Sequence, residues 1–175
     1  MRPALHVIAG PGPGQLATIA HPRADAWPVE NLAALARSGV QVLVSALTTA
    51  ELQRLGFGGT AQAAASVGVE FIPFPVADGG IPREEAAKVI ALSGRLAAHV
   101  RAGRFVVTQC FGGIGRSTLL ACTTLVLLGI APGDALRRVS GGSEMPVTRD
   151  WLFEFAAAHP ARQPVAAGPA HPGGN

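Results

Sequence analysis

Aromatic and charged side chains are scarce in this sequence. The chain has no tyrosine and only 5% aromatic residues, so its core must be built mainly from small and aliphatic side chains. Charged residues make up 14%, and 14 lysines and arginines against 11 acidic residues leave a formal net charge of +3. A charge this small and this scattered excludes a strong nucleic-acid-binding surface. Nucleic acid is therefore not an expected partner.

The sequence also lacks long apolar runs and has few cysteines. The longest apolar run covers residues 118–131, which is shorter than the roughly 18 residues that a membrane-spanning helix needs. The first apolar stretch is broken by the Gly-Pro run at 10–14, unlike a secretory signal. Only two cysteines occur, Cys110 and Cys122. We therefore expect a soluble, monomeric, cytoplasmic protein with no membrane contact and a reduced Cys110, with a disulfide between the two cysteines as the alternative.

Short apolar segments alternate with amphipathic segments along the chain. We expect strands at 5–9, 16–20, 41–45, 69–74 and 105–107, and helices at 28–38, 49–55, 60–67, 82–102, 117–128, 132–139 and 148–158. This alternation predicts a single α/β domain with a central, mostly parallel sheet flanked by helices. The domain is expected to span residues 1–159, and the Pro-, Gly- and Ala-rich residues 160–175 to form a disordered tail. Glu84 and Lys88 have the i,i+4 spacing of a helical ion pair.

The segment 106–117 carries a pattern suited to phosphoryl transfer. A strand leads to Cys110, a glycine-rich loop follows, and Arg116 and Ser117 open a helix that is apolar all round. Glycines let successive backbone N–H groups point into one cup, and the helix adds its positive N-terminal end. Arg116 can grip two phosphate oxygens, and these positive surroundings favour a nucleophilic Cys110 thiolate. The expected phosphate-binding residues are Phe111, Gly112, Gly113, Ile114, Gly115 and Arg116.

The same residues also have a purely structural interpretation. Cys110 would then be a buried thiol in a strand-to-helix turn, and Arg116 an ordinary surface residue. That interpretation leaves the loop glycines without a purpose, so we prefer phosphate binding. Ser117 has two compatible roles, because its hydroxyl can stabilise the Cys110 thiolate and can also cap the helix. The histidines show no metal-ligand spacing, and no metal or other cofactor is expected.

A second loop offers a general acid for the leaving oxygen. Asp78 follows an expected strand, and two glycines and a proline separate it from the long helix expected at 82–102. Such a loop can carry a carboxyl group over a bound phosphate. The local pattern is equally consistent with an Asp78 that makes the turn or caps the helix.

The two motifs together resemble those of the dual-specificity protein phosphatases, most closely the branch of the cyclin-dependent-kinase-associated phosphatase. The acid loop stands here at 77–82 as Ala-Asp-Gly-Gly-Ile-Pro. The phosphate loop stands at 110–117 as Cys-Phe-Gly-Gly-Ile-Gly-Arg-Ser. The likeness extends from about residue 29 to residue 155, and it implies the compact cysteine-phosphatase fold without a metal.

The resemblance also implies a function and a role for each site residue. Cys110 would be the nucleophile, Arg116 the phosphate clamp, and Asp78 the general acid and then the general base for water. The implied reaction is hydrolysis of phosphotyrosine, and also of phosphoserine or phosphothreonine, in a phosphorylated protein through a phosphocysteine intermediate. Apolar Phe111 and Ile114 make a phosphoinositide a weaker fit. The lack of tyrosine favours a shallower site than that of the larger tyrosine-specific enzymes.

Two positions depart from the family pattern. Gln109 stands where the family usually has the histidine before the nucleophile. The last loop offers Glu144 and Thr148 where the branch tends to have a glutamine that places the hydrolytic water. Gln109 therefore also supports an alternative of another class, a catalytically weak pseudophosphatase that binds phosphoproteins. Arsenate reductases of the low-molecular-weight type place the acid after the cysteine, whereas Asp78 precedes Cys110, and sulfurtransferase loops usually lack the Arg-Ser ending.

Overall fold

The computed structural model describes residues 4–20, 28–77, 83–111, 115–141 and 146–160. The predictions for Asp78, Gly112, Gly113, Ile114, Glu144 and the tail at 161–175 lie outside these described residues. The strands are β1 (His6–Val7), β2 (Gln15–Ala20), β3 (Val42–Ser45), β4 (Glu70–Pro73) and β5 (Phe105–Cys110). The helices are α1 (Pro28–Arg37), α2 (Thr49–Arg54), α3 (Thr60–Ser66), the 3-10 helix η1 (Arg83–Glu85), α4 (Ala86–Arg101), α5 (Arg116–Leu127), α6 (Pro132–Ser140) and α7 (Pro146–Ala158).

The described strands form one five-stranded sheet in the order β1-β2-β5-β3-β4. Strands β2, β5, β3 and β4 run parallel, and β1 is antiparallel to β2. The predicted α/β fold with a mostly parallel sheet is confirmed. β5 is longer than predicted, because its last residue, Cys110, still pairs with Ala20 of β2.

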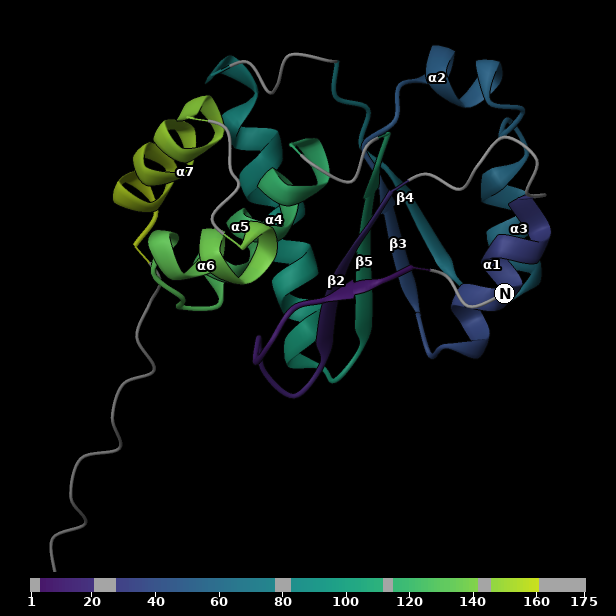
Figure 1. Cartoon of the computed structure of the whole chain (residues 1–175), viewed down its shortest axis with the longest axis horizontal. Coiled ribbons are helices and arrows are strands. Elements are labelled where there is room, and N and C mark those ends of the chain that lie inside the picture. Colours follow the sequence, from purple (N-terminus) through teal and green to yellow (C-terminus); the bar gives the residue numbers. More distant parts are fainter. Residues whose placement is uncertain (1–3, 21–27, 78–82, 112–114, 142–145, 161–175) are drawn as a thin grey trace, which may run out of the picture.

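Helices cover both faces of the sheet, with α1 and α3 on one side and α4, α5, α6 and α7 on the other (Figure 1). Successive residues of β5 point to opposite faces. Val107 packs with α1 and α3, whereas Val106 and Cys110 pack with α4, α5 and the closing helices. All six residues of β5 are buried, and residues 116–126 of α5 are buried as well. The centre of the domain is therefore the contact of β5 with α5.

The carboxyl ends of the parallel strands meet at one edge of the sheet. β5 ends there at Cys110, and α5 begins at the same edge. Helix α2 follows β3 after residues 46–48 and lies beside these strand ends (Figure 1). In open α/β sheets this edge is where ligands usually bind. The fold thus gathers α2, the end of β5 and the start of α5 around one place.

Helices α4 and α7 begin two or more residues away from their predicted starts. Arg83–Glu85 form the 3-10 helix η1, and α-helical geometry starts only at Ala86. Lys88 consequently pairs with Glu85, with Nζ 2.9 Å from Oε1, and not with the predicted Glu84. Helix α7 begins at Pro146, two residues earlier than predicted, because proline suits the first position of a helix.

The loop between β1 and β2 brings Gly14 directly against the main chain of the α4–β5 turn. Its N–H donates to the Val100 carbonyl at 2.9 Å. A Cβ at position 14 would lie 2.3 Å from the carbonyl oxygen of Arg104 and 2.5 Å from that of Val100. Because both oxygens are main-chain atoms, relief requires a backbone shift. We expect Gly14→Ala to lower the free energy of unfolding by about 3 kcal/mol, measured by urea denaturation.

Gly94 provides the matched control for this substitution. It lies exposed in the interior of α4, and a Cβ there would meet no heavy atom within 4 Å beyond its own helix. Gly94→Ala is expected to raise the free energy of unfolding by about 0.5–1 kcal/mol, because alanine loses less backbone entropy than glycine in a helix. Equal effects of the two substitutions would contradict the close approach at Gly14.

Candidate functional site

β5 and α5 position the predicted site residues that the structure describes. Cys110 is the last residue of β5, and Arg116 and Ser117 are the first two residues of α5. Their exposed fractions are 1%, 8% and 0%. Gly115 precedes α5 with a φ of +97°, a left-handed conformation that glycine adopts without strain. Phe111 is exposed beside them, whereas the remaining predicted site residues, Asp78, Gly112, Gly113 and Ile114, lie outside the described residues.

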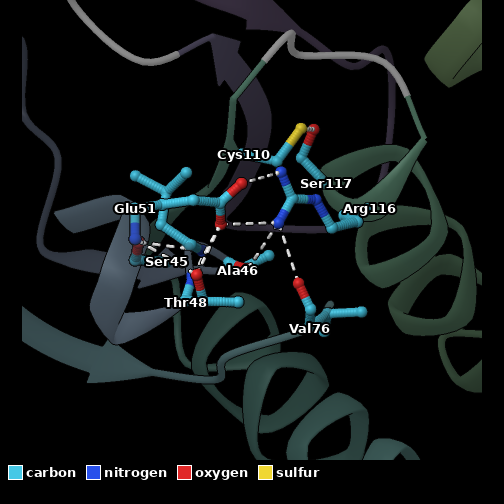
Figure 2. A network of polar contacts seen from close by, with 9 residues as sticks. Ser45, Ala46, Thr48, Glu51, Val76, Cys110, Arg116 and Ser117 are labelled. Atoms are coloured by element: carbon cyan, nitrogen blue, oxygen red, sulfur yellow. Dashed lines mark hydrogen bonds and ion pairs between the residues drawn. The ribbon is translucent and has the colours of Figure 1, made fainter. Parts of the chain in front are cut away.

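The sulfur of Cys110 lies against the hydroxyl of Ser117. The distance from Sγ to Oγ is 3.0 Å (Figure 2). A hydroxyl at this distance can donate a hydrogen bond to a thiolate and stabilise its negative charge. The Ser117 carbonyl in turn accepts a hydrogen bond from the Thr108 hydroxyl at 3.0 Å. Cys122, further along α5, is also a buried thiol.

Glu51 of α2 forms a two-pronged ion pair with Arg116. Nη1 lies 2.9 Å from Oε2, and Nη2 lies 2.9 Å from Oε1 (Figure 2). Nη1 also donates to the Val76 carbonyl at 2.8 Å and lies 3.4 Å from the Ala46 carbonyl. The side chains of the pair are only 8% and 14% exposed. These contacts from three different segments fix the plane of the guanidinium.

Glu51 is ionised throughout the physiological pH range. The pKa of its carboxyl group is lowered from 4.5 to about 2, mainly by hydrogen bonds from Arg116, although burial acts in the opposite direction. Thr48 contributes to this lowering, because its N–H donates to Oε2 at 2.8 Å and its hydroxyl donates to Oε2 at 3.1 Å. The carboxylate is therefore a permanent negative partner for the guanidinium.

Sequence reasoning missed Glu51 as a site residue. Thr48 and Glu51 form the capping box of α2, in which the Glu51 N–H donates to the Thr48 hydroxyl at 3.2 Å. The Thr-x-x-Glu spacing could have revealed this cap. Nothing local in the sequence indicates that the same carboxylate meets Arg116, 65 residues away.

The segment that leads toward Asp78 is anchored beside Arg116. The Val76 N–H donates to the Ala46 carbonyl at 3.1 Å, and the Val76 carbonyl accepts from Arg116. Only Ala77 separates this anchored residue from Asp78. The backbone therefore reaches the guanidinium immediately before the predicted acid loop.

Gln109 points away from the sulfur. Neighbouring residues of a strand face opposite sides of the sheet, so the Gln109 side chain lies on the face opposite Cys110. The residue is 8% exposed, and its main-chain carbonyl accepts a hydrogen bond from the Ala46 N–H at 2.8 Å. An effect of Gln109 on the thiol would thus act through the backbone and the shape of the loop.

No group of three or more His, Cys, Asp or Glu side chains that could hold a metal ion occurs in the described part of the chain. His99 lies near Glu70, with Nε2 3.6 Å from Oε2, but its Nδ1 faces Arg104 at 3.2 Å. A cation there would meet a guanidinium in place of a third ligand. None of the helices within the described ranges is long and apolar enough to cross a membrane.

Comparison with known structures supports the fold. The crystal structure of kinase associated phosphatase (KAP), with its catalytic-site cysteine replaced by serine, has a TM-score of 0.75 and 22% identity, covering 91% of this chain and 98% of that chain. Tk-PTP in the active form has a TM-score of 0.70 and 21% identity, covering 91% and 99%. PTPMT1 in complex with PI(5)P has a TM-score of 0.66 and 18% identity, covering 82% and 90%.

Comparison of the sequence with family models identifies the family. No curated protein matches the chain in sequence. The model described as cyclin-dependent kinase inhibitor 3 (CDKN3) matches residues 29–136, a range that contains Glu51, Cys110 and Arg116. This match covers more than half of the chain. The chain therefore belongs to the cyclin-dependent kinase inhibitor 3 family of dual-specificity phosphatases.

Proposed function

We propose that this chain is a cysteine-dependent protein phosphatase that hydrolyses phosphotyrosine, and also phosphoserine and phosphothreonine, through a phosphocysteine intermediate. The observation that carries the proposal is the contact of the Cys110 sulfur with the Ser117 hydroxyl, beside the fixed guanidinium of Arg116 (Figure 2). A hydroxyl donor, a guanidinium and a helix N-terminus are groups that stabilise negative charge on a nucleophilic sulfur.

In the first step the Cys110 thiolate attacks phosphorus. A bond forms between sulfur and phosphorus, and the bond from phosphorus to the substrate oxygen breaks. Asp78 gives its proton to that oxygen, because an alkoxide or phenoxide is otherwise a poor leaving group. Backbone N–H groups of residues 111–116 and the Arg116 side chain hold the phosphoryl oxygens. The product is a phosphocysteine and the free hydroxyl of the substrate.

In the second step water hydrolyses the phosphocysteine. Asp78, now a carboxylate, accepts a proton from water as the water oxygen bonds to phosphorus. The bond between sulfur and phosphorus breaks, and its electron pair returns to sulfur. The Ser117 hydroxyl donates to the thiolate that forms, 3.0 Å from Sγ in this structure. Inorganic phosphate then leaves.

The ion pair with Glu51 holds the Arg116 guanidinium from the side of α2. Glu51 accepts hydrogen bonds from Nη1 and Nη2, and the Val76 carbonyl accepts a hydrogen bond from Nη1. In the proposed reaction the guanidinium held in this way also contacts the phosphoryl oxygens.

The substrate of the proposed enzyme is a phosphorylated protein. Phe111 is 44% exposed and follows the nucleophile directly, so an apolar side chain lies at the rim of the site. An apolar rim suits the carbon skeleton of a phosphorylated side chain better than a headgroup with several phosphates. We further propose that the enzyme acts as a monomer in the cytoplasm.

Asp78→Asn is expected to lower kcat on a phosphotyrosine peptide by about 10²–10³-fold, because general acid catalysis contributes within this range. The loss on para-nitrophenyl phosphate should be smaller, since 4-nitrophenolate leaves without much help from an acid. Steady-state assays on both substrates measure the two ratios. Asp134→Asn, at an exposed ion pair with Arg137 on α6, is the control and should leave both rates unchanged. Equal losses on the two substrates in Asp78→Asn would contradict the acid role.

The proposed function is tested with the wild-type chain and four classes of phosphoester. The panel is para-nitrophenyl phosphate, a phosphotyrosine peptide, a phosphothreonine peptide and a phosphoinositide. Rapid acid quenching followed by mass spectrometry should find a phosphoryl group on Cys110. Turnover of the first two substrates with that intermediate would support the proposal. Preference for the phosphoinositide would overturn the substrate assignment.

A second candidate is a pseudophosphatase that binds phosphoproteins, and Gln109 is the residue that favours it. Tight binding of the phosphotyrosine peptide, measured by calorimetry, without turnover of any substrate would identify such a binding module. Gln109→His would then be expected to restore some turnover. An active wild type would exclude this candidate.

A further inference from the structure

Thr108 connects the strand before Cys110 to the helix after it. Its hydroxyl donates to the Ser117 carbonyl at 3.0 Å, and the residue is fully buried. Cys110 lies two residues later on the same face of β5, and its Sγ is 3.0 Å from the hydroxyl of the same Ser117. β5 therefore contacts Ser117 at two points, the carbonyl and the hydroxyl.

The strand itself does not require a threonine at this position. The pairing of β5 with β2 and β3 uses main-chain groups, and valine fits a buried strand at least as well, as Val106 and Val107 do next to it. A buried hydroxyl needs an acceptor. Thr124 finds its acceptor within its own helix, at the Leu120 carbonyl, whereas the Thr108 hydroxyl reaches across from strand to helix.

We propose that Thr108 is a positioning residue for the hydrolysis of the phosphocysteine, an inference that rests on the proposed function. Its hydrogen bond fixes the Ser117 backbone, and thereby the direction of the Ser117 hydroxyl toward Sγ. When water attacks phosphorus, the S–P bond breaks, the electron pair returns to sulfur and the water proton goes to the carboxylate base. The Ser117 hydroxyl donates a hydrogen bond to the Cys110 sulfur as negative charge forms on it.

The two chemical steps depend differently on this donor. The attack begins from a thiolate that the Arg116 guanidinium and the helix N-terminus also stabilise, so a weaker hydrogen bond from Ser117 does not slow it. The hydrolysis ends in a thiolate, so a weaker hydrogen bond raises its barrier. Loss of the Thr108 hydroxyl should therefore act on kcat, which includes hydrolysis, and spare kcat/KM, which reports the steps up to release of the first product.

Thr108→Val removes the hydroxyl and keeps the shape and burial of the side chain. We expect kcat on para-nitrophenyl phosphate to fall about tenfold, with KM falling in parallel and kcat/KM unchanged. Phosphoenzyme should accumulate, so stopped-flow absorbance should show a larger burst of 4-nitrophenolate than in the wild type. A general loss of structure would lower kcat and kcat/KM together and give no burst.

Three further variants make the test selective. Thr124→Val removes an equally buried hydroxyl that donates to the Leu120 carbonyl at 2.8 Å, and it should match the wild type. Thr108→Ser retains a hydroxyl and should restore kcat, whereas Thr108→Ala should not. If Thr108→Val fails to fold, comparison of kcat between Thr108→Ser and Thr108→Ala still tests whether the hydroxyl is needed.

The outcomes separate this inference from the proposed function. Two results with an active wild type would overturn this inference and leave the proposed function intact. One is a Thr108→Val variant with the kcat and burst of the wild type. The other is a Thr108→Ser variant as slow as Thr108→Ala. A wild type that releases no 4-nitrophenolate and forms no phosphoenzyme would overturn the proposed function and this inference with it.

Discussion

Cys110→Ser is expected to lower kcat on para-nitrophenyl phosphate by at least about 10⁴-fold. A serine hydroxyl stays protonated at neutral pH, and no base is positioned to activate it in the proposed mechanism. The substitution changes one atom, so the phosphate loop and the Arg116 ion pair should persist. The variant should still bind a phosphotyrosine peptide, which calorimetry can measure without interference from turnover.

Cys122→Ser is the matched control, because Cys122 is also a fully buried cysteine and lies on α5. It should keep kcat close to the wild-type value and lose some stability, since a hydroxyl replaces a mainly apolar thiol in the core. If Cys110→Ser turned over substrate as fast as the wild type, Cys110 could not be the nucleophile. If the wild type and Cys110→Ser were both inert, the binding-module hypothesis would replace the enzymatic one.

Glu51→Gln is expected to lower kcat/KM by about 10²-fold, because the guanidinium of Arg116 loses the carboxylate that fixes its plane, and small displacements of a substrate clamp have effects of this size. Glutamine also serves at the third helical position of a capping box, so α2 should keep its cap. The free energy of unfolding should fall by about 3 kcal/mol, since Arg116 remains a buried charge without its partner. Kinetics and urea denaturation measure the two effects.

The stability difference between wild type and Glu51→Gln should depend on pH in a defined direction. The pKa of Glu51 is about 2 in the folded chain against 4.5 for the ordinary group. A lowered pKa in the folded state stabilises the fold above the unfolded pKa, and this stability is lost as pH falls through the folded value. The advantage of the wild type should therefore be complete above about pH 5 and shrink from there toward about pH 2.

Glu70→Gln is the matched control, because Glu70 also pairs with an arginine, Arg95, but at the surface. Its side chain and that of Arg95 are 36% and 54% exposed, so loss of the pair should cost less than about 1 kcal/mol and leave activity unchanged. Equal costs for Glu51→Gln and Glu70→Gln would mean that backbone carbonyls alone hold Arg116.

The sequence predicts the layers of this fold better than the limits of its elements. Alternating apolar and amphipathic segments are enough to indicate a parallel sheet with helices on both faces. The predicted strand at 105–107 was too short, because Thr108 and Gln109 are polar residues that partners distant in sequence bury in β5. The predicted start of α4 was wrong because residues 83–85 form a 3-10 helix. This turn also changes which glutamate Lys88 can reach.

The site divides in the same way into local and distant parts. Cys110, Arg116 and Ser117 lie within eight residues, so the strand–loop–helix pattern predicts that they meet. Glu51 and Val76 reach Arg116 only because β3, β4 and β5 are neighbours in the sheet, which no local pattern reveals. The roles of these residues and of Asp78, which lies outside the described residues, remain predictions that the variants above test.

Arg116 joins α5 to the turn after β3, to α2 and to the segment after β4 through Ala46, Glu51 and Val76. Substitution of Arg116 would therefore cost stability as well as the proposed phosphate clamp, because it would leave Glu51 buried without its partner. An intact arginine in the Cys-x5-Arg signature is consequently poor evidence for turnover in a relative. The Cys110 sulfur is the atom on which the proposed chemistry depends, so this is the position where selection for turnover would be visible.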